Sequence, residues 1–142
     1  MDIQISFHYR RTDKPFKVVR TSLKRFALNI KTSSRIYVAL VSDKTIQKLN
    51  AEFLKKDKPT NVMSFEMNQI EPESGLLVTG EIIISVDTAR KEALNAGIPL
   101  EQRLIELFVH GYVHLLGLDH TKGRAEALKM KKKEQYFLQM FD

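Results

Sequence analysis

The 142-residue sequence contains no cysteine. Disulfide bonds and thiolate metal ligands are therefore excluded, so any transition-metal site must use imidazole and carboxylate groups. Long apolar runs are also missing, because the two longest, residues 80–85 and 104–118, are interrupted well short of the roughly 20 apolar residues that span a bilayer. The first residues show no secretory signal pattern. We therefore expect a cytoplasmic protein without a membrane partner, and the absences direct attention to its four histidines.

Acidic residues are outnumbered, with 17 Asp and Glu against 23 Lys and Arg, which gives a formal net charge of +6. A positive balance favours encounter with polyanions, but charge alone does not decide whether a chain binds nucleic acid. The length suits one domain over residues 1–142, because chains of roughly 100–200 residues usually build a single core.

The apolar pattern predicts strands and helices in a definite order. Strands are expected where apolar and polar residues alternate or where short β-rich runs occur, over residues 3–7, 35–42, 62–67 and 80–86. Helices are expected where apolar residues recur every three or four positions, over residues 16–30, 43–53, 87–96, 100–116 and 124–140. The order βαβαββααα indicates a single α+β domain, with a small mixed four-stranded sheet packed with about five helices.

Some side chains have expected places in these elements. The three isoleucines at positions 82–84 need cover on both faces, so their strand should be central. Asp43 is expected to cap the second helix, and Asp87 or Thr88 the third. Leu128 is expected to face inward on the last helix.

Three of the four histidines fall within eleven residues. His110 and His114 are four apart on a predicted helix, so their side chains project from one face, one turn apart. Gly117 lets the chain leave the helix and turn back, which would place His120 where it completes three nitrogen ligands, the number that holds a catalytic zinc. A fourth position, open to water or substrate, favours hydrolytic chemistry. We predict one divalent metal ion per chain, with zinc the first choice.

The histidines also have a simpler explanation. A histidine on an apolar helix is more often a hydrogen-bonded core residue, but three unpaired imidazoles would be costly to bury, and this favours a metal. His8, alone in the polar phase of the first strand, is interpreted as a surface residue. Asp119 either orients a histidine or assists a water, or it is a residue of the turn after the helix.

A zinc peptidase is a further possibility. The helical motif His-Glu-x-x-His places the general base beside the first ligand, but here Gly111 occupies that position. The peptidase interpretation would need a carboxylate from elsewhere in the chain, such as Glu81, as its base. Glycine also permits close approach of another backbone or of a bulky substrate.

Residues 110–120, His-Gly-Tyr-Val-His-Leu-Leu-Gly-Leu-Asp-His, closely resemble the signature His-Gly-x-x-His-Leu-x-Gly-x-Asp-His of the YbeY family of bacterial metal-dependent endoribonucleases. Lys-Pro-Thr-Asn-Val-Met-Ser-Phe at residues 58–65 and Gly-Glu-Ile-Ile-Ile-Ser at residues 80–85 are similar to two further segments of that family. Similar residues in the family's closing helix match Glu126, Met130 and Glu134. The resemblance runs from about residue 49 to residue 134, and the first third matches only in pattern.

This resemblance implies a zincin-like α+β fold in which His110, His114 and His120 hold zinc. It also implies cleavage of single-stranded RNA, with roles in maturing the 3′ end of small-subunit ribosomal RNA and in ribosome quality control. The expected partners are that RNA and the ribosome or its proteins, and the expected state is a monomer. His114 and Asp119 are the candidate catalytic residues.

One position departs from the family pattern. Leu54 stands where the family usually carries an arginine, so a contact to phosphate has to come from another residue. The basic segment that follows offers Lys55, Lys56 and Lys58 as candidate RNA contacts, although a lysine lacks the bidentate fork of arginine. Exposed lysines in a turn also need no ligand to explain them.

The alternative from another class is a ribosome-assembly factor that binds RNA or protein and uses its metal only structurally. Leu54 favours this factor. Three histidines without a fourth protein ligand favour the enzyme, because structural zinc sites are normally closed by four ligands.

Overall fold

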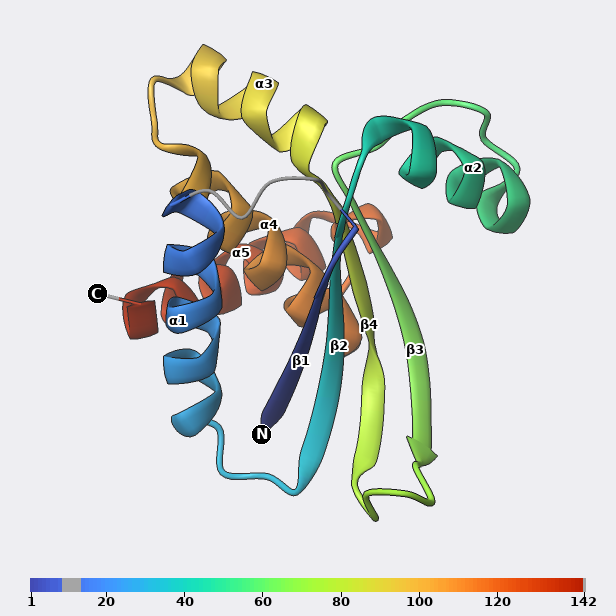
Figure 1. The fold of residues 1–142 in the computed structure, drawn as a ribbon, viewed down its shortest axis with the longest axis vertical. Helices are drawn as coiled ribbons and strands as arrows, with labels where there is room; N and C mark the ends of the chain where they lie inside the picture. The colour runs from blue at the N-terminus through green and yellow to red at the C-terminus, as the bar shows by residue number, and fades with distance from the viewer. Residues whose placement is uncertain (9–13, 142) are drawn as a thin grey trace.

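The computed structural model describes residues 1–8 and 14–141, and its elements follow the predicted order (Figure 1). The strands are β1 (Asp2–Phe7), β2 (Ser34–Val41), β3 (Val62–Ile70) and β4 (Leu77–Ser85). The helices are α1 (Lys14–Leu28), α2 (Asp43–Leu54), α3 (Val86–Ala96), α4 (Leu100–Leu115) and α5 (Arg124–Leu138), with short 3-10 helices η1 (His120–Lys122) and η2 (Gln139–Phe141). The predicted α+β class, with four strands and five α-helices in the described parts, is confirmed.

The sheet is mixed, with strand order β1-β2-β4-β3. β1 pairs with β2 and β2 with β4 in parallel, whereas β3 pairs with β4 in antiparallel register. β4 is therefore flanked on both sides, as expected for the isoleucine run. Ile82 and Ile84 belong to the core on one face and Ile83 to a smaller cluster on the other, and none is more than 6% exposed.

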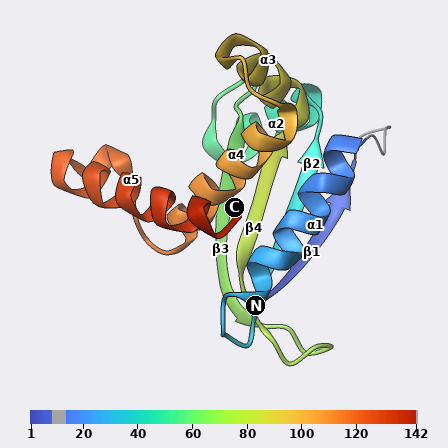
Figure 2. The ribbon, with the colours of Figure 1, turned by 90° about the vertical axis from the view of Figure 1, so that its left-hand side faces the viewer.

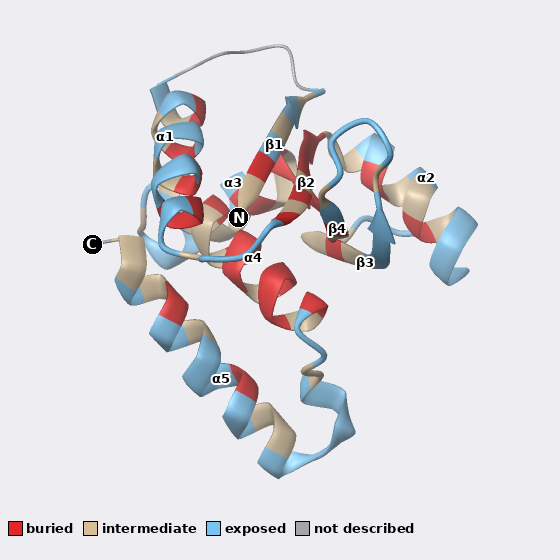
Figure 3. Cartoon of the chain, turned by 90° about the horizontal axis from the view of Figure 1, so that it is seen from below, coloured by how far each residue is buried: buried red, intermediate tan, exposed pale blue. Residues whose placement is uncertain are grey.

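The two faces of the sheet are covered unequally. The helices α1, α4 and α5 lie on one side and α2 on the other, as the view from below shows (Figure 3). The larger core is built around α4, whose residues Leu104, Phe108 and Val113 have no exposed surface. α5 projects sideways from this core (Figure 2). No helix in the described ranges is both long and apolar enough to cross a membrane.

Both expected helix caps are wrong by one or a few residues. Ser42 caps α2 and Ser85 caps α3, each accepting a backbone N–H three residues later. A cap residue must have extended backbone geometry, which these serines have and the first helical residues do not. Asp43 lies instead in the first turn of α2, where its carboxylate accepts the hydroxyls of Ser85 and Thr88.

The inward direction expected for Leu128 is also wrong, because its side chain is 55% exposed. The buried residues of α5 are Met130 and Phe137, seven positions apart. A residue two positions before Met130 projects to the opposite side of a helix. His8 is exposed, as expected for the polar phase of the first strand.

Candidate metal centre

The C-terminal half of α4 carries the first two histidines of the cluster. His110 and His114 are one turn apart, and their Nε2 atoms lie 3.2 Å from each other. The helix is fixed beneath them because Tyr112, Val113 and Leu115 are buried in the core. The two imidazoles are only half-buried, so the protein interior sets their position while leaving their edges accessible.

A sharp change of chain direction brings in the third histidine. Gly117 follows α4 with φ of +94°, a backbone conformation that glycine adopts without strain. The chain then enters η1, which begins at His120. One ligand atom from each of His110, His114 and His120 lies within 4.8 Å of the others. The structure therefore assembles the three histidines that the spacing predicted.

A carboxylate from α5 supports this cluster. The Nδ1 atom of His110 lies 2.6 Å from Oε1 of Glu134. When Nδ1 carries the proton and donates it to this carboxylate, the Nε2 lone pair is left facing the other histidines. Sequence reasoning placed Glu134 on the closing helix but gave it no role.

The surroundings of His114 favour the neutral form of its imidazole. Burial and the neighbouring imidazoles of His110 and His120 lower the pKa of His114 below its usual value of 6.5, although Asp119 and the backbone of Leu118 act in the opposite direction. Only a neutral imidazole has a lone pair for a metal ion. The surroundings of His114 therefore favour its ligand form at neutral pH.

Asp119 stabilises the turn between α4 and η1. Its Oδ1 accepts both the backbone N–H of Thr121, at 2.9 Å, and the Thr121 hydroxyl, at 2.8 Å. These two hydrogen bonds hold the pKa of Asp119 below its ordinary value. Its own N–H donates to Glu126 on α5. Asp119 thus fixes the segment from which His120 projects.

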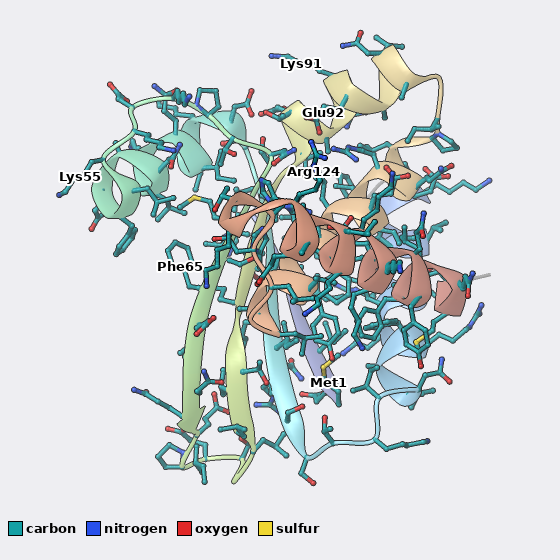
Figure 4. All side chains as sticks on the ribbon, turned by 180° about the vertical axis from the view of Figure 1, so that it is seen from behind. Met1, Lys55, Phe65, Lys91, Glu92 and Arg124 are labelled. Atoms are coloured by element: carbon teal, nitrogen blue, oxygen red, sulfur yellow. The ribbon has the colours of Figure 1, made fainter. Side chains whose placement is uncertain are left out.

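His110, His114 and His120 are among the residues that line an open groove of about 740 Å³. Its other lining residues come from the end of α2, from the segment that follows it and from the first half of β3. Leu54, Lys56 and Lys58 line this groove, whereas Lys55 is not among its lining residues. Lys55 ends α2 in a left-handed conformation, and Figure 4 shows it at the outer end of that helix.

Gly111 brings α4 close to the sheet and not to a substrate. A Cβ atom on Gly111 would lie 2.9 Å from both Ile82 Cγ2 and Ser64 Oγ, and Ser64 donates its hydroxyl to the Gly111 carbonyl at 3.1 Å. A side chain at position 111 would therefore collide with β3 and β4. Glu81 precedes Ile82 on β4, so it projects to the face of the sheet opposite α4.

The domain is of mixed α+β class, and three of its imidazoles converge in an open groove. These features define a class of protein that can hold one metal ion at a solvent-accessible centre. The comparisons agree with this class. The family model described as Endoribonuclease YbeY matches residues 4–142, so the chain belongs to the YbeY family.

Two relatives and one solved structure illustrate the similarity. Endoribonuclease YbeY of Aquifex aeolicus is 41% identical over 128 residues, which cover 90% of this chain and 82% of the relative. Endoribonuclease YbeY of Syntrophotalea carbinolica is 38% identical over 136 residues, covering 89% of each chain. The solution structure of a Thermotoga maritima protein superposes with a TM-score of 0.68 over 98% of this chain and 88% of its own, at 24% identity, and supports the fold.

Proposed function

We propose that this chain is a metal-dependent endoribonuclease that cleaves single-stranded RNA, with roles in maturing the 3′ end of small-subunit ribosomal RNA and in ribosome quality control. The observation that carries the proposal is the three-histidine cluster in a groove that lysines also line. Membership of a family described as endoribonucleases supports the reaction class. We further propose that residues 1–142 form one catalytic domain that works as a cytoplasmic monomer at the ribosome.

The residues present fit a zinc ion held by His110, His114 and His120. Two ligands of one tetrahedral zinc at about 2.0–2.1 Å from the ion are roughly 3.4 Å apart, close to the 3.2 Å between the Nε2 atoms of His110 and His114. Among the described residues the cluster contains three possible ligands, and three protein ligands are the number found in a catalytic zinc centre. When bound, zinc would polarise the scissile phosphate and activate the attacking water.

The chain's own residues prepare this centre and position the RNA. Glu134 is placed to accept an Nδ1 proton of His110, and burial lowers the pKa of His114, which favours its neutral form. In this proposal Asp119 acts on catalysis from beside the cluster, through the position of His120. Lys56 and Lys58 neutralise the RNA backbone along the groove, whereas Lys55, which does not line it, is not needed for this contact.

The assembly-factor alternative rests on Leu54, a half-exposed leucine in the groove wall where the resemblance leads one to expect an arginine. A factor of this kind would bind RNA without cutting it. The peptidase alternative is not supported, because Glu81 projects to the far face of the sheet and Gly111 is packed too tightly to be replaced by a base.

The decisive experiment compares the zinc-loaded wild type with His114→Ala and with His8→Ala as a matched control. His8 is an exposed histidine at the end of β1, so its loss should leave both zinc content and RNA cleavage unchanged. His114→Ala should lose most of its zinc and its cleavage of a single-stranded RNA. Equal cleavage by wild type and His114→Ala would reveal a contaminating nuclease, and a zinc-replete wild type that binds RNA without cutting it would support the assembly factor.

A further inference from the structure

The outer surface of α5 carries an unusual distribution of charge. Five of its fifteen residues are basic, and all five are exposed. They are spread around the solvent-exposed side of the helix and not along one line, and we call this set the α5 basic face. They are Arg124, Lys129, Lys131, Lys132 and Lys133. The helix has only two acidic residues, Glu126 and Glu134, and neither is fully exposed.

Both acids of α5 are engaged on the side of the metal centre. Glu134 contacts His110, and Glu126 accepts the backbone N–H of Asp119. No ion pair joins a carboxylate to the α5 basic face within the described ranges. By contrast, Arg35 and Arg103 each pair with two carboxylates. The described basic residues of α5 therefore have no carboxylate partner, and the ammonium of Lys133 lies over the rings of Tyr136 and Phe137.

This arrangement has a cost for the free protein. Lys129 and Lys133 are four residues apart, a spacing at which like charges destabilise a helix. The helix is also anchored by a narrow face, since its fully buried residues are only Met130 and Phe137. A solvated surface helix would normally alternate the signs of its charges, so a polyanion that covers this face would relieve the repulsion.

The α5 basic face adjoins the metal centre through the chain itself. α5 begins two residues after η1, which carries His120, and Figure 4 shows Arg124 at the first turn of the helix. At a rise of 1.5 Å per residue, Lys129 to Lys133 lie about 8–14 Å along the helix from that end. A strand that leaves the groove beside His120 would reach these lysines within a few nucleotides.

We infer that the α5 basic face is a second contact surface for the RNA substrate, which binds the backbone of the strand outside the catalytic groove. The inference rests on the proposed function. The contacts are to phosphates, so they add affinity and length dependence without reading the base sequence. Short RNA that fills only the groove does not use them.

The test uses Lys131→Gln/Lys132→Gln/Lys133→Gln, because glutamine has nearly the same helix propensity as lysine. The matched control, Lys14→Gln/Lys17→Gln/Lys31→Gln, removes the same charge from exposed positions on and after α1. Binding of a 2′-O-methylated single strand of about 20 nucleotides, checked on a gel to stay intact during the measurement, to the zinc-loaded proteins is measured by fluorescence anisotropy at several salt concentrations.

The α5 variant should bind RNA about tenfold more weakly than the wild type at 0.1 M salt. Its plot of log K against log salt should also be less steep, with the magnitude of the slope smaller by about 2. The control variant should stay near the wild type in both respects. All three proteins should cleave an oligomer of about 8 nucleotides within twofold of each other. Equal affinity of the α5 variant and wild type, or equal losses in both variants, would overturn the inference. A wild type that neither binds nor cleaves RNA would instead refute the proposed function.

Discussion

The Nδ1 atom of His110, on α4, lies 2.6 Å from Oε1 of Glu134, on α5, although 24 residues separate them in sequence. The contact ties the closing helix to the first histidine of the cluster. It fixes which ring nitrogen of His110 carries the proton, and therefore which nitrogen faces His114 and His120. α5 thus supports the metal centre through its contact with His110.

Glu134→Ala should therefore weaken zinc binding about 10- to 100-fold, because the ring of His110 loses its partner. The zinc affinity of Glu134→Gln should lie between those of the wild type and Glu134→Ala, because its amide oxygen still accepts a hydrogen bond from Nδ1 but carries no charge. Competition with a chromogenic chelator measures the affinity. Glu73→Gln, which removes a carboxylate at an exposed position outside α5, serves as the control and should stay near the wild type. Unchanged zinc affinity in Glu134→Ala would show that the contact does not position His110.

The histidine cluster could be predicted because its determinants are local. The four-residue spacing of His110 and His114 is a property of any helix, and Gly117 marks where that helix ends. Glu134 could not be identified in the same way. Its contact depends on how α5 crosses α4, and this crossing is decided by burial of Met130 and Phe137 in a core that the pattern alone does not describe.

The order of the strands along the chain and the central place of β4 could be predicted from the apolar runs, but the N-cap residues of α2 and α3 could not. Serine, threonine and aspartate all cap helices well, and several of them stand together at each helix start. The choice of Ser42 and Ser85 depends on where β2 and β4 end, since the cap residue is the one that keeps extended geometry. The groove was likewise invisible in the sequence, because its walls come from segments that meet only in the folded chain.

Leu54→Arg should strengthen binding of single-stranded RNA about three- to tenfold at low salt, because it adds a guanidinium to the groove wall. The side chain is 53% exposed, so the substitution should leave the folding stability almost unchanged. Leu94→Arg, at an 82% exposed position on α3, adds the same charge outside the groove and controls for net charge. If both variants bind RNA equally well, position 54 has no special access to the phosphates.

Lys55→Gly should stabilise the protein by about 0.5–1 kcal/mol in urea unfolding, because Lys55 ends α2 with φ of 59° and ψ of 31°, a conformation that suits glycine. Since Lys55 does not line the groove, RNA cleavage should stay within about twofold of wild type. Lys56→Gly is the control and should bring no gain in stability. A marked loss of cleavage in Lys55→Gly would instead establish Lys55 as an RNA contact.

Asp43 joins the start of α2 to the start of α3. Its Oδ1 accepts the hydroxyls of Ser85 and Thr88, and its Oδ2 lies 3.7 Å from the ammonium of Lys91. Burial alone would raise the pKa of Asp43, but the two hydroxyls and Lys91 together hold it below the ordinary value of 3.8. The ionised carboxylate therefore stabilises the folded chain.

The sign of the pH dependence follows from this lowered pKa. The stabilisation is complete above the unfolded-state value near 3.8 and is lost as the pH falls through the folded-state value. Asp43→Asn should cost about 1 kcal/mol at pH 7, because its amide cannot replace the charge-assisted hydrogen bonds. Urea unfolding of both proteins from pH 7 to pH 3 measures the difference between their free energies of unfolding. This difference should stay constant down to about pH 4 and become smaller below it. The control, Glu73→Gln at an exposed position, should have almost the same free energy of unfolding as the wild type at every pH. If the difference between wild type and Asp43→Asn became larger in acid, the ionised carboxylate of Asp43 would not be the stabilising group.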